Sequence, residues 1–236
     1  MVQRSVLITG GRGGLGGAVV DLFAATGWRV VVPVRPGREP DQPPVGWSDQ
    51  PGGVVEVIAD LADDDQVAAA VAVAAEDRDA PLRGLVNLAG GYASGGPVHE
   101  TAIEDFERML AVNLRPTYLV TRAALPHLVA AGGGSVVCVS ARAALAPFAG
   151  AAGYVTAKAA VLAFASAVAV EYRRSGVRCN TVLPSIIDTP ANRAAQPDAD
   201  HARWVPPAEI AGVIRFLVSD ESAPTSGATV PVYGRA

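Results

Sequence analysis

Cysteine is scarce in this chain, and both cysteines lie inside apolar runs. Cys138 and Cys179 are therefore better explained as buried thiols than as a disulfide or part of a metal site. Histidine is also sparse, and the three histidines lack the close spacing of metal ligands. We expect no metal, and we assign surface or capping roles to His99, His127 and His201.

Long runs of basic residues are absent as well. The formal net charge is -4, so the charge pattern does not indicate a nucleic-acid partner. The N-terminus leads directly into a short apolar run and a glycine turn, without the longer apolar stretch and cleavage site of a signal peptide. We see no apolar run of membrane-spanning length either. The sequence therefore predicts a cytoplasmic protein without a membrane partner.

Apolar residues, by contrast, are plentiful at 50% of the chain, which is enough for a large buried core. Strand-like apolar runs alternate with helical patterns from end to end, which is typical of parallel βαβ units. We predict one Rossmann-type, three-layer α/β domain over residues 1–236, with a seven-stranded, mainly parallel sheet. The predicted strands are 5–9, 28–34, 54–59, 82–88, 135–140, 177–183 and 228–232. The predicted helices are 15–26, 63–79, 153–174 and 207–219, together with 101–131, which is one long helix or a helix pair.

Two segments have neither pattern. Residues 35–53 are rich in proline and glycine, and residues 184–206 connect the sixth predicted strand to the last helix. Long segments without secondary structure inside a compact domain often serve as active-site lids. We therefore expect both to be mobile loops and 184–206 to be the substrate loop.

The turn from Thr9 to Gly16 has the sequence TGGRGGLG and lies between the first strand and the first helix. Glycines let a backbone turn sharply and approach a pyrophosphate, and the following helix offers free N–H groups to its oxygens. The context therefore predicts a dinucleotide site. The alternative is a plain strand–helix connector.

The spacing of Gly10, Gly14 and Gly16 after Thr9 resembles the turn of the short-chain dehydrogenase/reductase family. Further motifs of that family follow in order along the whole chain, including an Asn-Leu-Ala-Gly segment and a Tyr-x-x-x-Lys pair. The resemblance implies a nicotinamide dinucleotide cofactor and a small-molecule substrate. The cofactor-binding residues that it implies are Thr9, Gly10, Arg12, Gly14, Leu15, Gly16, Arg35, Asp60, Leu61, Asn87, Ala89, Gly90, Tyr154, Lys158, Pro184, Ile187 and Thr189.

Tyr154 and Lys158 are four residues apart and therefore share one helix face. A lysine ammonium beside a tyrosine favours the phenolate and lowers the phenol pKa from about 10. Such a tyrosine can give a proton to a developing alkoxide or amine. We predict Tyr154, Lys158 and Asn113 as the catalytic set, with Asn113 holding a water as in the family or capping a helix break. Alone, the Tyr–Lys pair would be two exposed residues on a helix.

The family's catalytic serine is missing, because the position thirteen residues before Tyr154 is Ala141. Ser140 precedes it, but neighbouring side chains of a strand point to opposite faces. One branch of the family, the dihydropteridine reductases, also lacks this serine. The glycine turn, residues 89–92 and residues 183–204 resemble that branch. The predicted substrate pocket is Tyr92, Ser140, Ala141 and Trp204, where Trp204 either closes over the substrate or packs the loop down.

This resemblance favours an acceptor that is already electrophilic, such as a quinonoid or C=N group. The alternative is an ordinary ketone reductase that holds the carbonyl oxygen with Tyr154, water or Ser140. Two further alternatives are a nucleotide-binding sensor without turnover and a non-redox cyclase. The resemblance also implies a homodimer or homotetramer that forms through residues 101–131 and 153–174.

The cofactor type is expected to depend on the end of the second strand, which reads Val32-Pro33-Val34-Arg35. An acidic residue there would bind the adenosine 2′-hydroxyl of NAD, whereas an arginine would pair with the 2′-phosphate of NADP. We therefore favour NADP(H) over NAD(H), with Arg12 as a second candidate for the phosphate. The alternative is that Arg35 and Arg38 are solvated loop charges.

Overall fold

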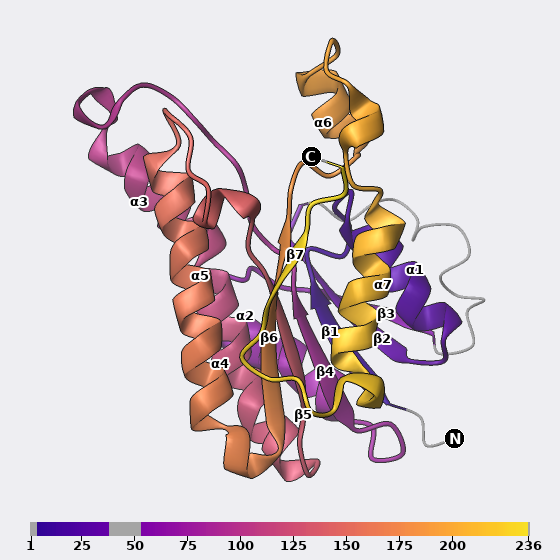
Figure 1. Cartoon of the computed structure of the whole chain (residues 1–236). Helices are drawn as coiled ribbons and strands as arrows, with labels where there is room; N and C mark the ends of the chain where they lie inside the picture. The colour runs from indigo at the N-terminus through magenta and orange to yellow at the C-terminus, as the bar shows by residue number, and fades with distance from the viewer. Residues whose placement is uncertain (1–3, 38–52, 236) are drawn as a thin grey trace.

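A computed structural model describes residues 4–37 and 53–235 of the chain (Figure 1). Seven strands form one sheet in the order β3-β2-β1-β4-β5-β6-β7, and every neighbouring pair is parallel. This confirms the predicted fold class. The strands are β1 (Ser5–Thr9), β2 (Arg29–Val34), β3 (Val54–Ile58), β4 (Leu82–Asn87), β5 (Gly134–Val139), β6 (Val177–Pro184) and β7 (Thr229–Val232).

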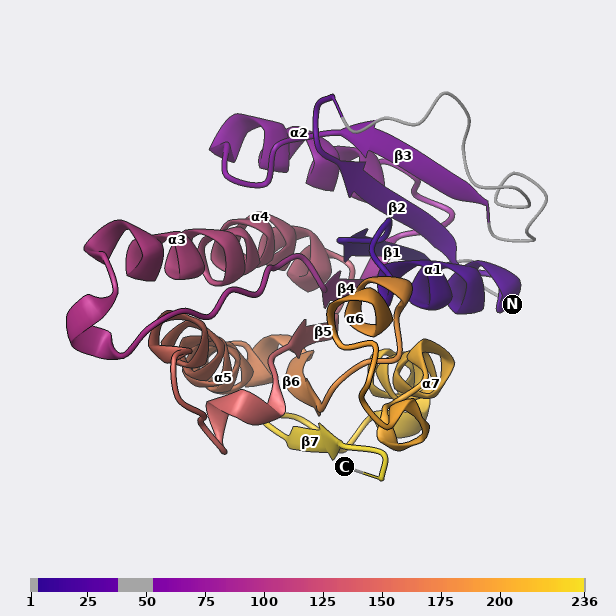
Figure 2. The same cartoon turned by 90° about the horizontal axis from the view of Figure 1, so that it is seen from above.

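Helices cover both faces of the sheet, as Figure 2 shows from above. One face packs against α1 (Gly16–Ala25) and α7 (Pro207–Val218). The other face packs against α2 (Asp64–Ala75), α4 (Arg115–Ala130) and α5 (Ala152–Glu171). Because both faces are covered, the central strands are continuous apolar runs rather than alternating ones. All five residues of β1 are buried.

The strand order reverses between β1 and β4. The chain runs from β1 through β2 to β3 on one side of β1, and β4 then lies on the other side. Open α/β sheets bind their ligands beyond the carboxyl ends of the strands at such a switch point. The register pairs Thr9 with Asn87 and Asn87 with Cys138, so β1, β4 and β5 end side by side. The loops that follow these strands are thereby brought together at one edge of the sheet.

Two predicted segments are defined further by the structure. Residues 101–131, predicted as one long helix or a helix pair, form the pair α3 (Ile103–Asn113) and α4, with the break at Leu114. The expected structureless loop 184–206 instead contains α6 (Pro190–Ala195) and a short 3-10 turn, His201–Arg203. Thr189 explains the start of α6, because its hydroxyl accepts a hydrogen bond from the Asn192 N–H. Residues 38–52 of the other predicted loop, including Arg38, lie outside the described residues.

The helix α5 corrects our statement that no segment reaches membrane-spanning length. By length and composition alone, its 20 residues are apolar enough to cross a membrane. Its contacts are those of a core helix, because it packs against α3 and β6 and its inner side belongs to the core cluster. Burial accounts for the apolar inner side of α5 only, because 39% of the apolar window is buried.

Candidate active site

The glycine turn joins β1 to α1 in a shape that side chains would obstruct. Gly10 has a φ of +68°, and a Cβ there would lie 3.0 Å from the backbone nitrogen of Ala89. A Cβ on Gly16 would collide with the carbonyl oxygen of Gly10. The Thr9 hydroxyl accepts hydrogen bonds of 3.1 Å from the N–H groups of Leu88 and Ala89, which ties the turn to the end of β4.

The turn also has backbone donors available for a ligand. Gly13 N–H bonds to the Gly10 carbonyl, but Gly14 and Leu15 have no N–H acceptor among the described residues. These groups lie at the N-terminus of α1, where the helix dipole favours negative charge. The open backbone cradle therefore fits the pyrophosphate of a dinucleotide.

The loop after β6 contacts this turn from the other side. A Cβ on Gly14 would lie 2.7 Å from Cγ2 of Thr189, so Thr189 packs directly against the turn. Ile187 forms an isolated bridge with Val205, and β6 ends at Pro184. In both views α6 lies above the carboxyl ends of the central strands (Figures 1 and 2). The structure thus brings Thr189 of this loop to the glycine turn.

Arg12, the second candidate for a 2′-phosphate, forms an ion pair. Its Nε and Nη2 donate to the two carboxylate oxygens of Glu56, with 2.5 Å between Nε and Oε1. Arg35 directly follows β2 and is exposed. Glu56 was missed by sequence reasoning, although a charged residue inside the apolar strand Val54–Ile58 signals a partner. The exposed Arg35 is therefore the better placed of the two arginines for a phosphate.

Asp60 and Leu61, two of the predicted cofactor-binding residues, lie just beyond β3. The Asp60 carboxylate accepts a hydrogen bond of 3.0 Å from the Ala62 N–H, and the Asp60 N–H donates to the side chain of Gln66. Asp60 and Leu61 are both half-buried. Asp60 thus shapes the turn before α2 and leaves its other carboxylate oxygen without a partner among the described residues.

Asn87 and Asn113 hold the segment that follows β4. Asn87 is buried at the end of that strand and donates to the hydroxyl of Thr121 at 3.0 Å. Asn113 ends α3, and its amide bonds to both the N–H and the carbonyl of Gly91, at 3.2 and 3.0 Å. A Cβ on Gly90 would lie 2.6 Å from Asn113 Oδ1 and 3.4 Å from Lys158 Nζ. Asn113 therefore positions the backbone next to the lysine and also marks the helix break.

Tyr154 and Lys158 both lie on α5, as the spacing predicts. Lys158 Nζ lies 5.9 Å from the centre of the Tyr154 ring and donates to the carbonyl oxygen of Val139 at 3.2 Å. Tyr92 packs edge-on against Tyr154, with 5.1 Å between ring centres. The lysine, the tyrosine and the ends of β4 and β5 thus meet at one place.

Burial dominates the electrostatics of this pair. It raises the pKa of Tyr154 to about 12 and lowers the pKa of Lys158 to about 8. The expectation that Lys158 lowers the tyrosine pKa is therefore wrong for the protein alone, because desolvation outweighs the distant ammonium. At neutral pH Tyr154 is a protonated phenol, and Lys158 is mostly an ammonium. This is the state required of a proton donor with a cation nearby.

The four residues predicted for the substrate pocket have different environments. Ser140 is buried, and its hydroxyl donates to the backbone carbonyl of Lys158 at 2.7 Å. Ala141 follows in an extended conformation. Trp204 is 7% exposed, and its ring contacts that of His201, so it packs the loop down. Tyr92 is 60% exposed and packs against the Tyr154 ring, so a substrate wall at Tyr92 stays a prediction.

A small pocket of about 120 Å³ adjoins Tyr154, and sequence reasoning did not identify it. Its lining comes from the segments 93–96 and 150–154 and from α3. These segments carry no recognisable motif, since their shared position depends on the fold. Among the described residues, no cluster of three histidine, cysteine, aspartate or glutamate side chains could hold a metal ion.

Known proteins are similar to this chain in both sequence and structure. The family model for short chain dehydrogenase matches residues 4–200. The 2-(R)-hydroxypropyl-CoM dehydrogenase of Xanthobacter autotrophicus is 35% identical and covers 99% of this chain and 98% of its own. Levodione reductase of Leifsonia aquatica is 31% identical, with 98% and 93% covered. The solved structure of ElxO with NADP bound is 26% identical, with a TM-score of 0.90 over 98% and 97%. This chain therefore belongs to the short-chain dehydrogenase family and is an NAD(P)-dependent oxidoreductase.

Proposed function

We propose that the chain is an NADP(H)-dependent reductase of a small, electrophilic acceptor, of the C=N or quinonoid class. The observation that carries this proposal is that neither Ser140 nor Ala141, at the end of β5, offers a hydroxyl hydrogen bond to a substrate. Ala141 has none, and the hydroxyl of Ser140 is occupied by the carbonyl of Lys158. A protonated imine or a quinonoid ring needs less polarisation than a ketone, so it needs no second donor.

The cofactor would lie across the carboxyl ends of β1 and β4. The glycine turn would hold its pyrophosphate, and Arg35 would face the adenosine 2′-phosphate. Thr189, next to Gly14, would contact the nicotinamide end. When bound, the nicotinamide supplies the hydride. The NADP in the similar ElxO structure supports this choice of cofactor.

Tyr154 supplies the proton in this proposal. As hydride reaches the acceptor carbon of a neutral imine or quinonoid ring, the C=N electron pair moves to nitrogen, which takes the proton from Tyr154 Oη; a protonated imine already carries this proton. The resulting phenolate is stabilised by the Lys158 ammonium, whose own carbonyl contact to Val139 holds it in place. Asn113 acts as a positioning residue, because it fixes the backbone at Gly91 beside the lysine.

A second candidate is a ketone reductase or alcohol dehydrogenase. It is favoured by the names of the relatives, a hydroxypropyl-CoM dehydrogenase and a levodione reductase. In that reaction Tyr154 would be the main donor to the carbonyl oxygen. The two candidates use the same hydride and the same proton and differ only in the acceptor.

The test is steady-state oxidation of NADPH and NADH with three acceptor classes: a quinonoid dihydropterin, cyclic imines and small ketones. We expect the first two classes to be reduced with a kcat/KM at least tenfold higher than the ketones, and NADPH to be preferred. Higher kcat/KM on ketones would establish the second candidate instead. Tight NADPH binding without turnover on any class would favour the sensor function.

A cytoplasmic location and a homodimer or homotetramer remain part of the proposal. The oligomer is supported by exposed apolar side chains on α4 and α5, including Tyr118, Val129 and Val170. Sedimentation velocity would measure the number of subunits.

A further inference from the structure

A pocket of about 520 Å³ lies at the amino ends of the strands, opposite the active site. We call it the amino-edge pocket and define it by Arg4, Arg83, Arg173, Arg178 and Asp220, which line it together with neutral residues. Arg4 precedes β1 and the glycine turn follows it, so the two sites are roughly 20 Å apart at about 3.3 Å per residue. Its volume is in the range of about 300–1,000 Å³ that is typical of small-molecule sites.

The charge of this pocket differs from that of the whole protein. Four arginines and a single acidic residue line it, an excess of three positive charges, whereas the chain as a whole carries -4. The helices α4, α5 and α7 end nearby, and each helix C-terminus contributes about half a negative charge. About one and a half positive charges remain after this correction. A cavity with this excess favours an anionic ligand.

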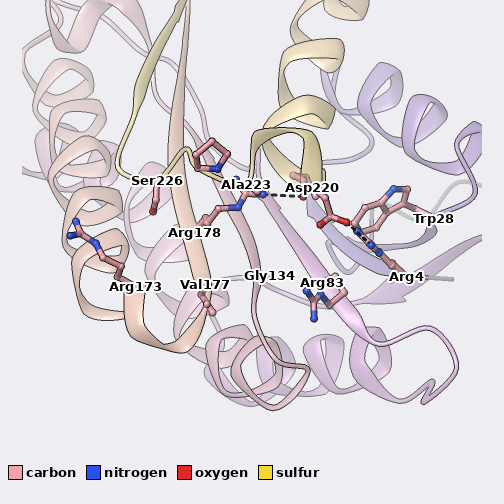
Figure 3. A pocket seen from close by; sticks show the side chains of 13 residues that line it. Arg4, Trp28, Arg83, Gly134, Arg173, Val177, Arg178, Asp220, Ala223 and Ser226 are labelled. Atoms are coloured by element: carbon pink, nitrogen blue, oxygen red, sulfur yellow. Dashed lines mark hydrogen bonds and ion pairs between the residues drawn. The ribbon is translucent and has the colours of Figure 1, made fainter. Parts of the chain in front are cut away.

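Three of the four arginines lie near Asp220. Figure 3 shows Arg4, Arg83 and Arg178 around that residue, whereas Arg173 lies apart, on the far side of Arg178. Arg4 Nη2 bonds to the Asp220 carboxylate at 2.7 Å. This bond and the charges of Arg4, Arg83 and Arg178 lower the pKa of Asp220, so all three guanidinium groups act on the same small volume.

Arg83 and Arg173 have hydrogen-bond donors that the protein does not use. A guanidinium has five N–H donors. Arg83 uses one of its groups, Nη1, on the carbonyl of Ala131, and Arg173 has no side-chain partner among the described residues. Both side chains can therefore bind a phosphate oxygen without breaking an existing contact with a carboxylate.

Arg178 carries the fourth charge and lacks a direct counter-ion. Its five hydrogen bonds run to the end of α7 and the following loop, and every acceptor is neutral. Among the described residues it forms no salt bridge, since the Asp220 carboxylate is held by Arg4 instead. Partial burial lowers the pKa of Arg178. A half-buried cation without a counter-ion is stabilised when an anion enters beside it.

We propose that the amino-edge pocket is a second ligand site, which binds a phosphate-bearing small molecule through hydrogen bonds from Arg4, Arg83 and Arg173. Arg178 contributes its positive charge, because its Nη1 and Nη2 groups already donate to neutral acceptors of the protein. Guanidinium groups pair with phosphate through two parallel hydrogen bonds, which suits several arginines around one cavity. The ligand replaces Asp220 as the partner of Arg4 and leaves the hydrogen bonds inside the domain intact. This site is independent of the acceptor and of the cofactor type at the active site.

Calorimetric titration with inorganic phosphate and with pyrophosphate tests the proposal, at constant ionic strength. The protein is first saturated with its nicotinamide cofactor, because the glycine turn would otherwise bind the same probes. We expect one bound pyrophosphate per chain, with a lower affinity for monophosphate. Binding that disappears when the cofactor site is filled would overturn the proposal.

Four variants locate the site. Arg83→Gln and Arg173→Gln should each weaken pyrophosphate binding about tenfold, the loss expected for one charged hydrogen bond. Arg174→Gln is the matched control, because it removes the same charge from the neighbouring exposed position outside the pocket and should change affinity less than twofold. Asp220→Asn removes the competing carboxylate and should tighten binding severalfold. Equal losses in Arg173→Gln and Arg174→Gln, or weaker binding in Asp220→Asn, would refute the site.

Discussion

Ser140 and Lys158 are joined by a hydrogen bond of 2.7 Å from the serine hydroxyl to the lysine carbonyl oxygen. Lys158 returns the contact, since its Nζ donates to the carbonyl of Val139. Two hydrogen bonds, from Ser140 and to Val139, therefore connect the end of β5 to Lys158 in α5. This arrangement removes Ser140 from the pocket and leaves Ala141 as the residue at the position of the family's serine.

Restoring that serine tests whether the acceptor needs a second donor. In Ala141→Ser, we expect ketone reduction to rise about tenfold or more, because one positioned donor is worth roughly 10²–10³ in kcat at an optimised site. Reduction of imines or quinonoid dihydropterin should change less than threefold. The measurement is kcat/KM for each class.

Ala143→Ser provides the control. Ala143 is buried in the short 3-10 turn Arg142–Ala144, two residues after Ala141, so this variant adds a hydroxyl at a different position. If Ala141→Ser raises every class equally, the missing serine does not discriminate between acceptors.

Tyr154 is expected to be the proton donor. Tyr154→Phe should lower kcat about 10²–10⁴-fold, the usual effect of a positioned general acid. Cofactor binding, measured by fluorescence titration, should stay within threefold of the wild type. Tyr172→Phe is the matched control, because it removes a phenol just beyond the other end of α5 and should leave kcat unchanged. Turnover that survives in Tyr154→Phe would show that another group donates the proton.

The pH dependence of reduction should report Lys158. Burial lowers the pKa of Lys158 to about 8, whereas Tyr154 at about 12 keeps its proton throughout the working range. Because the ammonium stabilises the phenolate that forms, kcat should be constant below pH 8 and fall about tenfold per unit above it. The profile is measured from pH 6 to 10 with saturating substrates.

Lys158→Arg separates this cause from others, since an arginine stays charged over that range. The variant will be slower, but its profile should lose the decline above pH 8. A decline that persists in Lys158→Arg must come from a different group.

The elements of the fold are largely predictable from the sequence because each has a local signal. The buried run Ser5–Thr9 and the glycine turn after it are contiguous, and Tyr154 and Lys158 share one helix face by spacing alone. The contact of Arg12 with Glu56 joins residues 44 positions apart and depends on the pairing of β2 with β3. Such contacts need the register of the sheet.

Burial is a second quantity that local patterns do not contain. Trp204 appears in a polar loop, so its sequence context allows either a lid or an anchor, and only the packing of that loop onto the domain decides for the anchor. The pKa of Tyr154 is reversed for the same reason, since spacing identifies the nearby lysine but not the loss of solvent around both groups.

Arg35 is expected to select the phosphorylated cofactor. Arg35→Ser should raise the KM for NADPH about tenfold or more and leave the KM for NADH within twofold, because only NADPH has the 2′-phosphate. Arg115→Ser is a suitable control, as an arginine whose side chain bonds to the carbonyl of Ala62 instead. A wild-type enzyme that prefers NADH would disprove the assignment of Arg35.

Gly90 should tolerate no side chain. A Cβ there would lie 2.6 Å from Asn113 Oδ1, and the Asn113 amide cannot retreat because it is buried and bonded to Gly91 and to Met109. In Gly90→Ala we expect the free energy of unfolding to fall by about 1–3 kcal/mol, the usual cost of overpacking. We expect kcat to fall as well, because Asn113, which fixes the backbone beside Lys158, is displaced. Urea denaturation and steady-state kinetics measure the two effects.

Gly91→Ala is the control, since its Cβ would meet only Val112 at an ordinary 3.6 Å. Wild-type stability and kcat in Gly90→Ala would mean that Asn113 does not constrain this segment.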